Sequence, residues 1–279
     1  MQAESVTVGL VQWLPLRGAQ DENLATALTA MRSAADRGCE VAVLPELWLC
    51  GYGTTRAVVE AVRSAEPIDG RVGSLIAEAV ADCGMVICAG SFPERHEARI
   101  FDTSVVYDRS GARVLTHRKV HLYGSEAELF DPGEGFSTAD VEGLGTVGVC
   151  ICFDGDFPES ARALRQQGAR IVFHPCAYEA ATRRWWDLVY PAQALCNGQW
   201  WLSSNQHGGE GPASFFGGSR VLAPNGEVRA QGPDGPPTPD RPELVIATLA
   251  IAGELADADA ASAVLFDARR PTGDSPGHV

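Results

Sequence analysis

An α/β fold is predicted by the way apolar, strand-like runs alternate with amphipathic helices along the chain. The first such repeat is a strand, a helix that ends at a glycine, and a second apolar strand, which together make a βαβ unit. The 279 residues, of which 45% are hydrophobic, are enough to bury one sizeable core. We therefore expect one α/β domain whose ligands gather beyond the carboxyl ends of its strands.

The first βαβ unit spans residues 6–44. Residues 6–12 are typical of a short buried strand, and residues 41–44 form the second apolar run. Between them, residues 22–37 place five apolar side chains on one helical face before Gly38: Leu24, Ala27, Leu28, Met31 and Ala35. Glu46 follows directly after Pro45, at the sheet edge where ligands are expected.

The same alternation continues along the chain. It predicts helices over 72–82, 159–167 and 183–197, and strands over 85–90, 102–107, 112–116, 146–152, 170–174 and 199–204. Asn225-Gly226 indicates a tight hairpin, and 232–243 is too rich in proline and glycine for regular structure. With a last strand over 244–250, we expect a domain of residues 1–250. An arm of residues 251–279 follows it and is expected to be partly mobile at 273–279.

The charge balance excludes several classes of partner. The formal net charge is −14 and the pI is about 4.8, and no cluster of Lys and Arg is present. Nucleic acid and anionic membrane surfaces are therefore disfavoured, because both carry negative charge. No apolar run approaches the roughly 20 residues that span a bilayer, and the first ten residues lack the pattern of a secretory signal. We expect a cytoplasmic protein.

The eight cysteines are predicted to be reduced. Cys88, Cys150 and Cys152 lie inside apolar, strand-like runs rather than in a small loop-rich scaffold, which disfavours a disulfide framework. No CxxC spacing occurs, so a structural zinc site is not expected. Most of these cysteines are interpreted as small core residues.

Three positions have the chemistry and the placement of catalytic groups. Cys152 ends the apolar run 145–152 and is followed by a predicted turn into a helix near Pro158, so its thiol is expected at the end of the sheet. A nearby cation or amide dipole would favour thiolate there. Lys119 follows a strand that ends near residue 116, and an ammonium group can stabilise a tetrahedral oxyanion. Glu46 has apolar neighbours, which predicts an enclosed carboxylate of raised basicity that needs a cationic partner.

With these residues in this order, the sequence resembles the nitrilase superfamily of carbon–nitrogen hydrolases over nearly the whole chain. The resemblance rests on the blocks Leu44-Pro-Glu-Leu with Gly51-Tyr52, Arg118-Lys-Val-His-Leu, Gly148-Val-Cys-Ile-Cys-Phe-Asp-Gly-Asp-Phe-Pro-Glu, Phe215-Phe-Gly-Gly-Ser and Pro224-Asn-Gly-Glu. Several separate blocks in the right order make a chance match implausible.

The resemblance implies a catalytic triad of Glu46, Lys119 and Cys152. It also implies a second glutamate that positions the lysine and the substrate amide, and the spacing to Gly133 favours Glu128 over Glu126. The implied fold is a four-layer αββα sandwich. The implied assembly is a homodimer or larger homo-oligomer, with the C-terminal arm at the interface.

The implied activity is hydrolysis of a non-peptide carbon–nitrogen bond in a small amide or N-carbamoyl compound through a cysteine thioester, with neither metal nor cofactor. Phe153 stands where tyrosine or tryptophan is common, and its backbone N–H is expected in the oxyanion hole. Asp156 stands where hydrolases of carbamoyl amino acids tend to carry arginine, which disfavours an anionic substrate. Tyr52 and Tyr178 are expected to bind substrate, and further candidates for the pocket wall are Trp48, Trp185, Trp186 and His207.

Three alternatives remain open at this point. A nitrilase would attack a small nitrile with the same cysteine, although the short chain and Glu128 favour the amidase-like branches. A noncatalytic scaffold would keep the fold alone. A thiol-redox protein would use Cys150 and Cys152 as a reversible pair. Asp154 and Asp156 indicate a neutral or cationic ligand, unless they cap the following helix.

Overall fold

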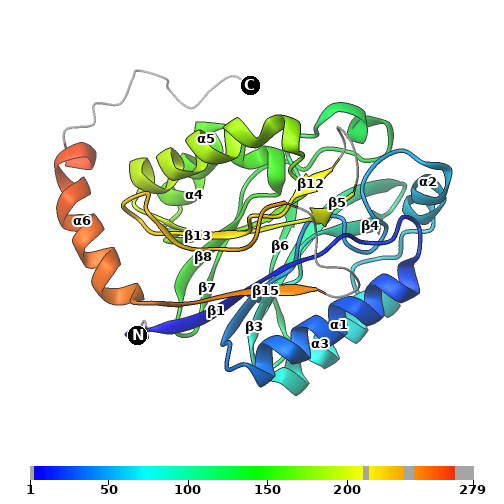
Figure 1. Cartoon of the computed structure of the whole chain (residues 1–279), viewed down its shortest axis with the longest axis horizontal. Helices are drawn as coiled ribbons and strands as arrows, with labels where there is room; N and C mark the ends of the chain where they lie inside the picture. The colour runs from blue at the N-terminus through cyan, green and yellow to red at the C-terminus, as the bar shows by residue number, and fades with distance from the viewer. Residues whose placement is uncertain (1–2, 210–213, 236–241, 268–279) are drawn as a thin grey trace.

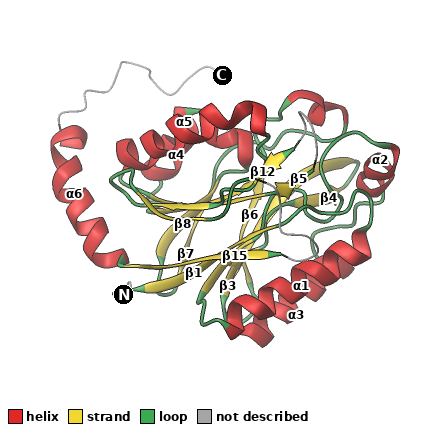
Figure 2. Cartoon of the chain, viewed as in Figure 1, coloured by secondary structure: helices red, strands yellow, loops and turns green. Residues whose placement is uncertain are grey.

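The computed structural model describes residues 3–209, 214–235 and 242–267. Two β-sheets stack face to face, and helices cover both outer faces, which gives the four-layer arrangement in Figures 1 and 2. Strands β1 and β2 of one sheet pack against β9 and β10 of the other. The four-layer αββα architecture implied by the sequence is thus present.

Within the described residues, seven strands form the first sheet and six form the second. The first runs in the order β15-β1-β2-β3-β5-β4 with β6 beside β5: β1 Val6–Gln12, β2 Val41–Val43, β3 Val86–Cys88, β4 Phe92–His96, β5 Arg99–Tyr107, β6 Arg113–Arg118 and β15 Glu243–Leu249. The second runs β14-β13-β10-β9-β8-β7: β7 Thr138–Val141, β8 Gly145–Val149, β9 Ile171–Cys176, β10 Trp200–Asn205, β13 Arg220–Leu222 and β14 Val228–Gln231. A small hairpin pairs β11 His207–Gly208 with β12 Phe215–Phe216.

The helices complete the outer layers. Helices α1 Gln20–Asp36 and α3 Arg71–Cys83 cover the first sheet, and α4 Pro158–Gln166 and α5 Arg183–Asn197 cover the second (Figure 1). The other helices are α2 Arg56–Arg63, α6 Ile251–Asp267 and the short 3₁₀ segments η1 Gly124–Glu128, η2 Cys152–Asp156 and η3 Ala180–Thr182. No helix in the described part of the chain is long and apolar enough to cross a bilayer.

Strand alternation explains how one strand serves two cores. Val41 and Val43 of β2 belong to the core between the sheets, whereas Ala42 belongs to the core beneath α1 and α3. Because both faces of β2 are buried, this strand is apolar throughout and appears in the sequence as a continuous hydrophobic run.

Most predicted elements are confirmed, with boundaries that shift by a few residues. The hairpin at Asn225-Gly226 joins β13 to β14, and Gly226 adopts a φ of 81° that favours glycine. The sequence missed α2, β4 and β7, which are short or carry charged residues. The arm begins as α6, which Arg170 anchors through Asp259 at 2.8 Å. Residues 236–241 of the predicted loop and the predicted mobile end lie outside the described residues, and the division at residue 250 stays a prediction.

Candidate active site

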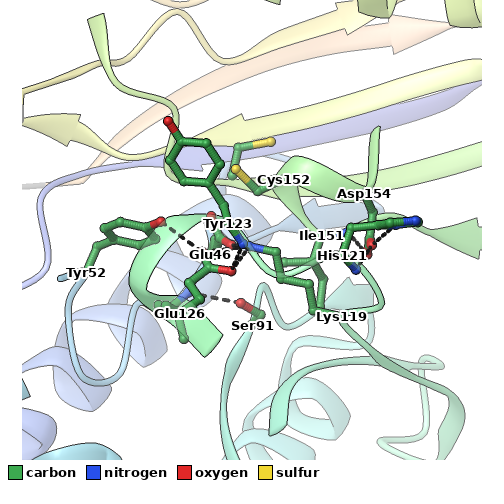
Figure 3. A network of polar contacts seen from close by, with 12 residues as sticks. Glu46, Tyr52, Ser91, Lys119, His121, Tyr123, Glu126, Ile151, Cys152 and Asp154 are labelled. Atoms are coloured by element: carbon green, nitrogen blue, oxygen red, sulfur yellow. Dashed lines mark hydrogen bonds and ion pairs between the residues drawn. The ribbon is translucent and has the colours of Figure 1, made fainter. Parts of the chain in front are cut away.

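Glu46, Lys119 and Cys152 come together at one edge of the stacked sheets. Glu46 follows β2 and Lys119 follows β6, both in the first sheet, whereas Cys152 follows β8 in the second. Stacking the sheets therefore brings a carboxylate and an ammonium group against a thiol (Figure 3). The Glu46 and Lys119 side chains are fully buried, and Cys152 is 7% exposed.

The Lys119 ammonium group lies between two carboxylates. Its Nζ donates to Glu46 Oε1 at 2.6 Å and to Glu126 Oε1 at 2.8 Å, and it lies 2.7 Å from Glu126 Oε2. The Tyr52 hydroxyl donates to Glu126 Oε1 at 2.8 Å. Burial lowers the pKa of Lys119, but the two carboxylates outweigh burial and raise the pKa well above its ordinary value. The lysine is therefore charged and held in one position.

The second glutamate beside Lys119 is Glu126, so the choice of Glu128 from the sequence spacing is wrong. Both residues lie in η1, and a 3₁₀ helix has about three residues per turn, so positions two apart face different directions. Glu126 points inward and also accepts a hydrogen bond from the Tyr123 backbone N–H at 2.8 Å. Glu128 is exposed.

Glu46 has an unusual electrostatic environment. Burial raises its pKa to about 7, against the opposing effect of Lys119, and Glu126 raises it further. Its Oε2 is buried and has no hydrogen-bond partner at normal distance among the described residues. The Cys152 thiol is the other neighbour that lowers the Glu46 pKa. One carboxylate oxygen is thus bound to the lysine, and the other is free to accept a proton.

The backbone at Cys152 is strained, and a buried histidine holds its carbonyl group. Cys152 has a φ of 44°, a left-handed conformation that residues other than glycine rarely adopt. His174 Nε2 lies 3.1 Å from the Cys152 carbonyl, which can only accept, so this nitrogen carries the proton and Nδ1 accepts from Ser203 at 3.0 Å. Burial lowers the pKa of His174 to about 4, so the imidazole is neutral near pH 7.

The Cys152 thiol is protonated at rest. Burial, the adjacent Cys176 thiol and the Glu46 carboxylate raise its pKa well above the ordinary value, and Lys119 lowers it without reversing the sign. Lys119 favours the thiolate, as expected of a nearby cation, but it is already paired with two carboxylates and does not outweigh the effect of burial on the pKa of the thiol. Cys150 is fully buried in the core, so the two cysteines do not share one exposed face.

Asp154 joins the loop that carries Lys119 to the turn that carries Cys152. Its Oδ1 accepts hydrogen bonds from the backbone of Val120 at 3.1 Å and of His121 at 2.8 Å, and from His121 Nδ1 at 3.0 Å. Its Oδ2 accepts from His117 Nε2 at 2.9 Å and from the Ile151 backbone at 3.1 Å. The carboxylate is fully buried, and the imidazole hydrogen bonds hold its pKa well below the usual range. Asp154 therefore acts on the site through its neighbours, away from the pocket.

A cavity of about 360 Å³ opens above the Cys152 thiol. Four predicted substrate-binding residues line it, namely Tyr52, Phe153, Asp156 and Tyr178. Trp185 also lines the cavity, but Trp48 and Trp186 are fully buried in the core and His207 contacts Glu243 instead. The sequence missed the remaining wall residues, which are Tyr123, Phe157, Ala177, Glu179 and Thr182.

Comparison with known proteins identifies the family. Residues 7–253 match the family model described as carbon-nitrogen hydrolase. The chain belongs to this family. It is 30% identical over 236 residues to the omega-amidase NIT2-A of Xenopus laevis, with 80% of this chain and 83% of that protein covered. It is 32% identical over 225 residues to a nitrilase of Pyrococcus abyssi, with the same shares covered.

A solved amidase structure has the same fold as this chain. A mutant of the amidase from Nesterenkonia sp. AN1, in complex with butyramide, matches this hydrolase with a TM-score of 0.75 at 25% identity. The match covers 94% of this chain and 97% of that chain. The resemblance found in the sequence and the fold it implied are confirmed. The protein is an amidase-like carbon–nitrogen hydrolase that acts on bonds other than peptide bonds.

Proposed function

We propose that this hydrolase cleaves the carbon–nitrogen bond of small amides through a thioester on Cys152. The observation that carries the proposal is the buried Lys119 ammonium group between Glu46 and Glu126, directly beside a thiol that opens into a cavity. This arrangement supplies a nucleophile, a base and a cation around one reacting carbon. A relative that binds butyramide adds support for a small amide.

In the acylation step, Cys152 attacks the amide carbonyl while Glu46 takes the thiol proton. The Glu46 pKa of about 7 suits this role, because a base of that strength can accept a proton and return it near neutral pH. The sulfur–carbon bond forms and the carbonyl electrons move to oxygen. Glu46 then delivers its proton to the leaving nitrogen, the carbon–nitrogen bond breaks, and ammonia or an amine departs.

The oxyanion formed in this step needs donors that are already in place. Lys119 supplies a fixed positive charge. Phe153 is the second residue of η2, where backbone N–H groups have no acceptor within the helix, so its N–H is available to the oxyanion. Water then attacks the thioester as Glu46 removes its proton, the sulfur–carbon bond breaks, and the acid leaves with Cys152 protonated again.

Intact-mass spectrometry tests the covalent step directly. Mixing the protein with a panel of small amides, N-carbamoyl amines and nitriles and quenching within seconds is expected to reveal an acyl adduct on a peptide that contains Cys152. Ammonia release is measured in parallel. Turnover of amides without any adduct, or with an adduct on another residue, would overturn the thioester mechanism. Turnover of nitriles alone would select the nitrilase alternative.

We also propose that the protein is a homodimer that pairs through α5. Trp185, Leu188 and Leu195 lie three and seven residues apart on this helix and are 55%, 58% and 53% exposed. This spacing places them along one helical face, and such an apolar stripe is typical of an interface. Light scattering is expected to give a dimer mass for the native chain and a monomer mass for Leu188→Glu. Glu128→Gln is the control, because it alters an exposed acid away from the stripe, and a dimer that survives Leu188→Glu contradicts the proposal.

A further inference from the structure

The charged residues that line the cavity are all acidic. Asp156 and Glu179 are acidic, and no lysine, arginine or histidine occurs among the described residues that line the cavity. The rest of the wall is mostly aromatic, with tyrosine, phenylalanine and tryptophan side chains. A substrate with a carboxylate would meet no cationic partner here, and it would face two carboxylates instead.

The cation beside the reacting thiol, Lys119, already holds the two catalytic-site carboxylates. Lys119 donates hydrogen bonds to Glu46 and Glu126, and its side chain has no exposed surface. Its remaining capacity is directed at the Cys152 end of the site, where the amide carbonyl reacts. It therefore cannot also hold a carboxylate at the far end of a substrate.

Asp156 lines the cavity and is held there by two tyrosine hydroxyls. Tyr178 and Tyr190 both donate their hydroxyls to its Oδ1, the latter at 2.8 Å. Its Oδ2 receives no hydrogen bond from the described residues, although Asp156 lines the cavity. Burial raises the pKa of Asp156, and the two tyrosine hydroxyls oppose that rise. One oxygen is fixed by the protein, and the other is available to a ligand.

The separation of Cys152 and Asp156 along η2 gives an approximate length for the ligand. Asp156 is four residues after Cys152, and a 3₁₀ helix rises about 2 Å per residue, so the two positions are about 8 Å apart along the helix. We infer that the preferred substrates are primary amides of short aliphatic chains that end in an ammonium group, with Asp156 as the residue that binds the ammonium. This inference rests on the proposed amidase function.

Two further features favour a cationic end group. Aromatic faces attract ammonium groups, and Tyr52, Tyr178 and Trp185 contribute such faces to the wall. The net charge of −14 also draws cations toward the protein and repels anions. The local wall and the long-range field therefore select the same substrate charge.

A panel of three amides of equal chain length isolates the charge. Hexanamide is neutral, 6-aminohexanamide ends in an ammonium group, and adipic acid monoamide ends in a carboxylate. The kcat/KM for the ammonium compound is expected to exceed that for hexanamide about tenfold or more, which is the effect of one hydrogen bond to a charged partner. The carboxylate compound is expected to be the poorest. The preference for the ammonium compound is expected to appear mainly as a lower KM. It is expected to shrink as the salt concentration is raised from about 0.02 to about 0.5 M.

The variant Asp156→Asn tests whether the charge of Asp156 causes the preference for the ammonium compound. Asparagine keeps the size and an oxygen that accepts from the tyrosines, but it removes the charge. The ratio of kcat/KM between 6-aminohexanamide and hexanamide is expected to fall to about one in this variant. Glu128→Gln is the matched control, because it removes an exposed acid outside the cavity and should leave the ratio unchanged. The salt dependence of the native enzyme supplies the same test if Asp156→Asn does not fold.

The outcomes separate this inference from the proposed function. Equal rates for all three amides, or a preference for the carboxylate compound, would overturn the inference and leave the amidase proposal standing. A cationic preference that persists in Asp156→Asn would overturn the role of Asp156. Failure to hydrolyse hexanamide and both charged amides would count against the proposed function itself.

Discussion

Glu46 and Asp154 are both completely buried carboxylates, yet their surroundings give them opposite acidities. Glu46 has a hydrogen bond to Lys119 on one oxygen and none at normal distance on the other among the described residues, and burial raises its pKa to about 7. Asp154 accepts five hydrogen bonds from backbone and imidazole groups, and its pKa is held well below the usual range.

The difference separates a group that moves protons from a group that holds the structure. A carboxylate whose charge is poorly compensated takes up a proton readily, which a general base requires. A carboxylate surrounded by donors stays ionised and fixes the segments that supply the donors. The same residue class thus serves reactivity in one place and geometry in the other, and mutations should affect the two in different ways.

Removal of the nucleophile gives the largest expected effect. Cys152→Ala is expected to lower kcat by about 10⁴-fold or more, because the covalent route is lost. Glu46→Gln is expected to lower kcat by about 10³-fold through loss of the base. The free energy of unfolding is expected to change by less than about 1 kcal/mol, because burial already disfavours the Glu46 charge and Glu126 still pairs with Lys119. Ammonia release and urea unfolding measure the two quantities. A Glu46→Gln protein with near-native kcat would exclude Glu46 as the base.

Asp154→Asn should lower the stability of the protein more, and its kcat less, than Glu46→Gln does. The amide cannot accept all five hydrogen bonds, so the free energy of unfolding is expected to fall by about 3 kcal/mol. The kcat is expected to fall about 10- to 100-fold, because Lys119 and Cys152 lose their shared anchor. Urea unfolding at pH 7 provides the measurement, with Glu46→Gln as the comparison. Equal stability losses in the two variants would remove the distinction between the two carboxylates.

The pH profile sharpens the comparison further. Because the Glu46 pKa is raised to about 7, its basic form is depleted below that pH, and log kcat/KM is expected to fall with unit slope as pH drops below about 7. Glu46→Gln should abolish this limb. The lowered pKa of Asp154 means that its stabilising effect is complete above its ordinary pKa near 3.8 and is lost only as pH falls further. The native protein is therefore expected to lose activity as pH falls below about 7 and to unfold only below about pH 4. The two losses would appear as separate transitions.

The fold was largely predictable because its helices and strands carry a clear apolar periodicity. Both faces of β2, β9 and β10 are buried, so β2 and the first halves of β9 and β10 appear in the sequence as hydrophobic runs. The strand β4 was missed because its sequence, Phe92-Pro-Glu-Arg-His, contains a proline and three polar residues. Its pairing with β5 comes from tertiary contacts that local propensity does not contain.

The site was predictable where a motif fixes the residue and unpredictable where a short helix sets the direction. Glu46, Lys119 and Cys152 meet as expected because each follows a strand at the same edge. The choice between Glu126 and Glu128 depended on the rotation of η1, which spacing alone does not give. The capping role of Glu126, which accepts from the Tyr123 backbone N–H three residues earlier, was the available signal. The turn at Asp154 was equally hidden, because its five donors come from three segments.

The smallest expected effect comes from Tyr52→Phe, which tests how firmly the lysine cluster is held. The change removes one hydroxyl that donates to Glu126 at 2.8 Å and keeps the aromatic wall of the cavity. Glu126 retains its contacts with Lys119 and Tyr123, so kcat is expected to fall only about 3- to 10-fold, which corresponds to one hydrogen bond to a charged group. The acid limb near pH 7 should remain, because Tyr52 does not touch Glu46 in any described contact. A loss as large as that in Glu46→Gln would mean that Tyr52 takes part in proton transfer, and the division between base and supporting residues would have to be redrawn.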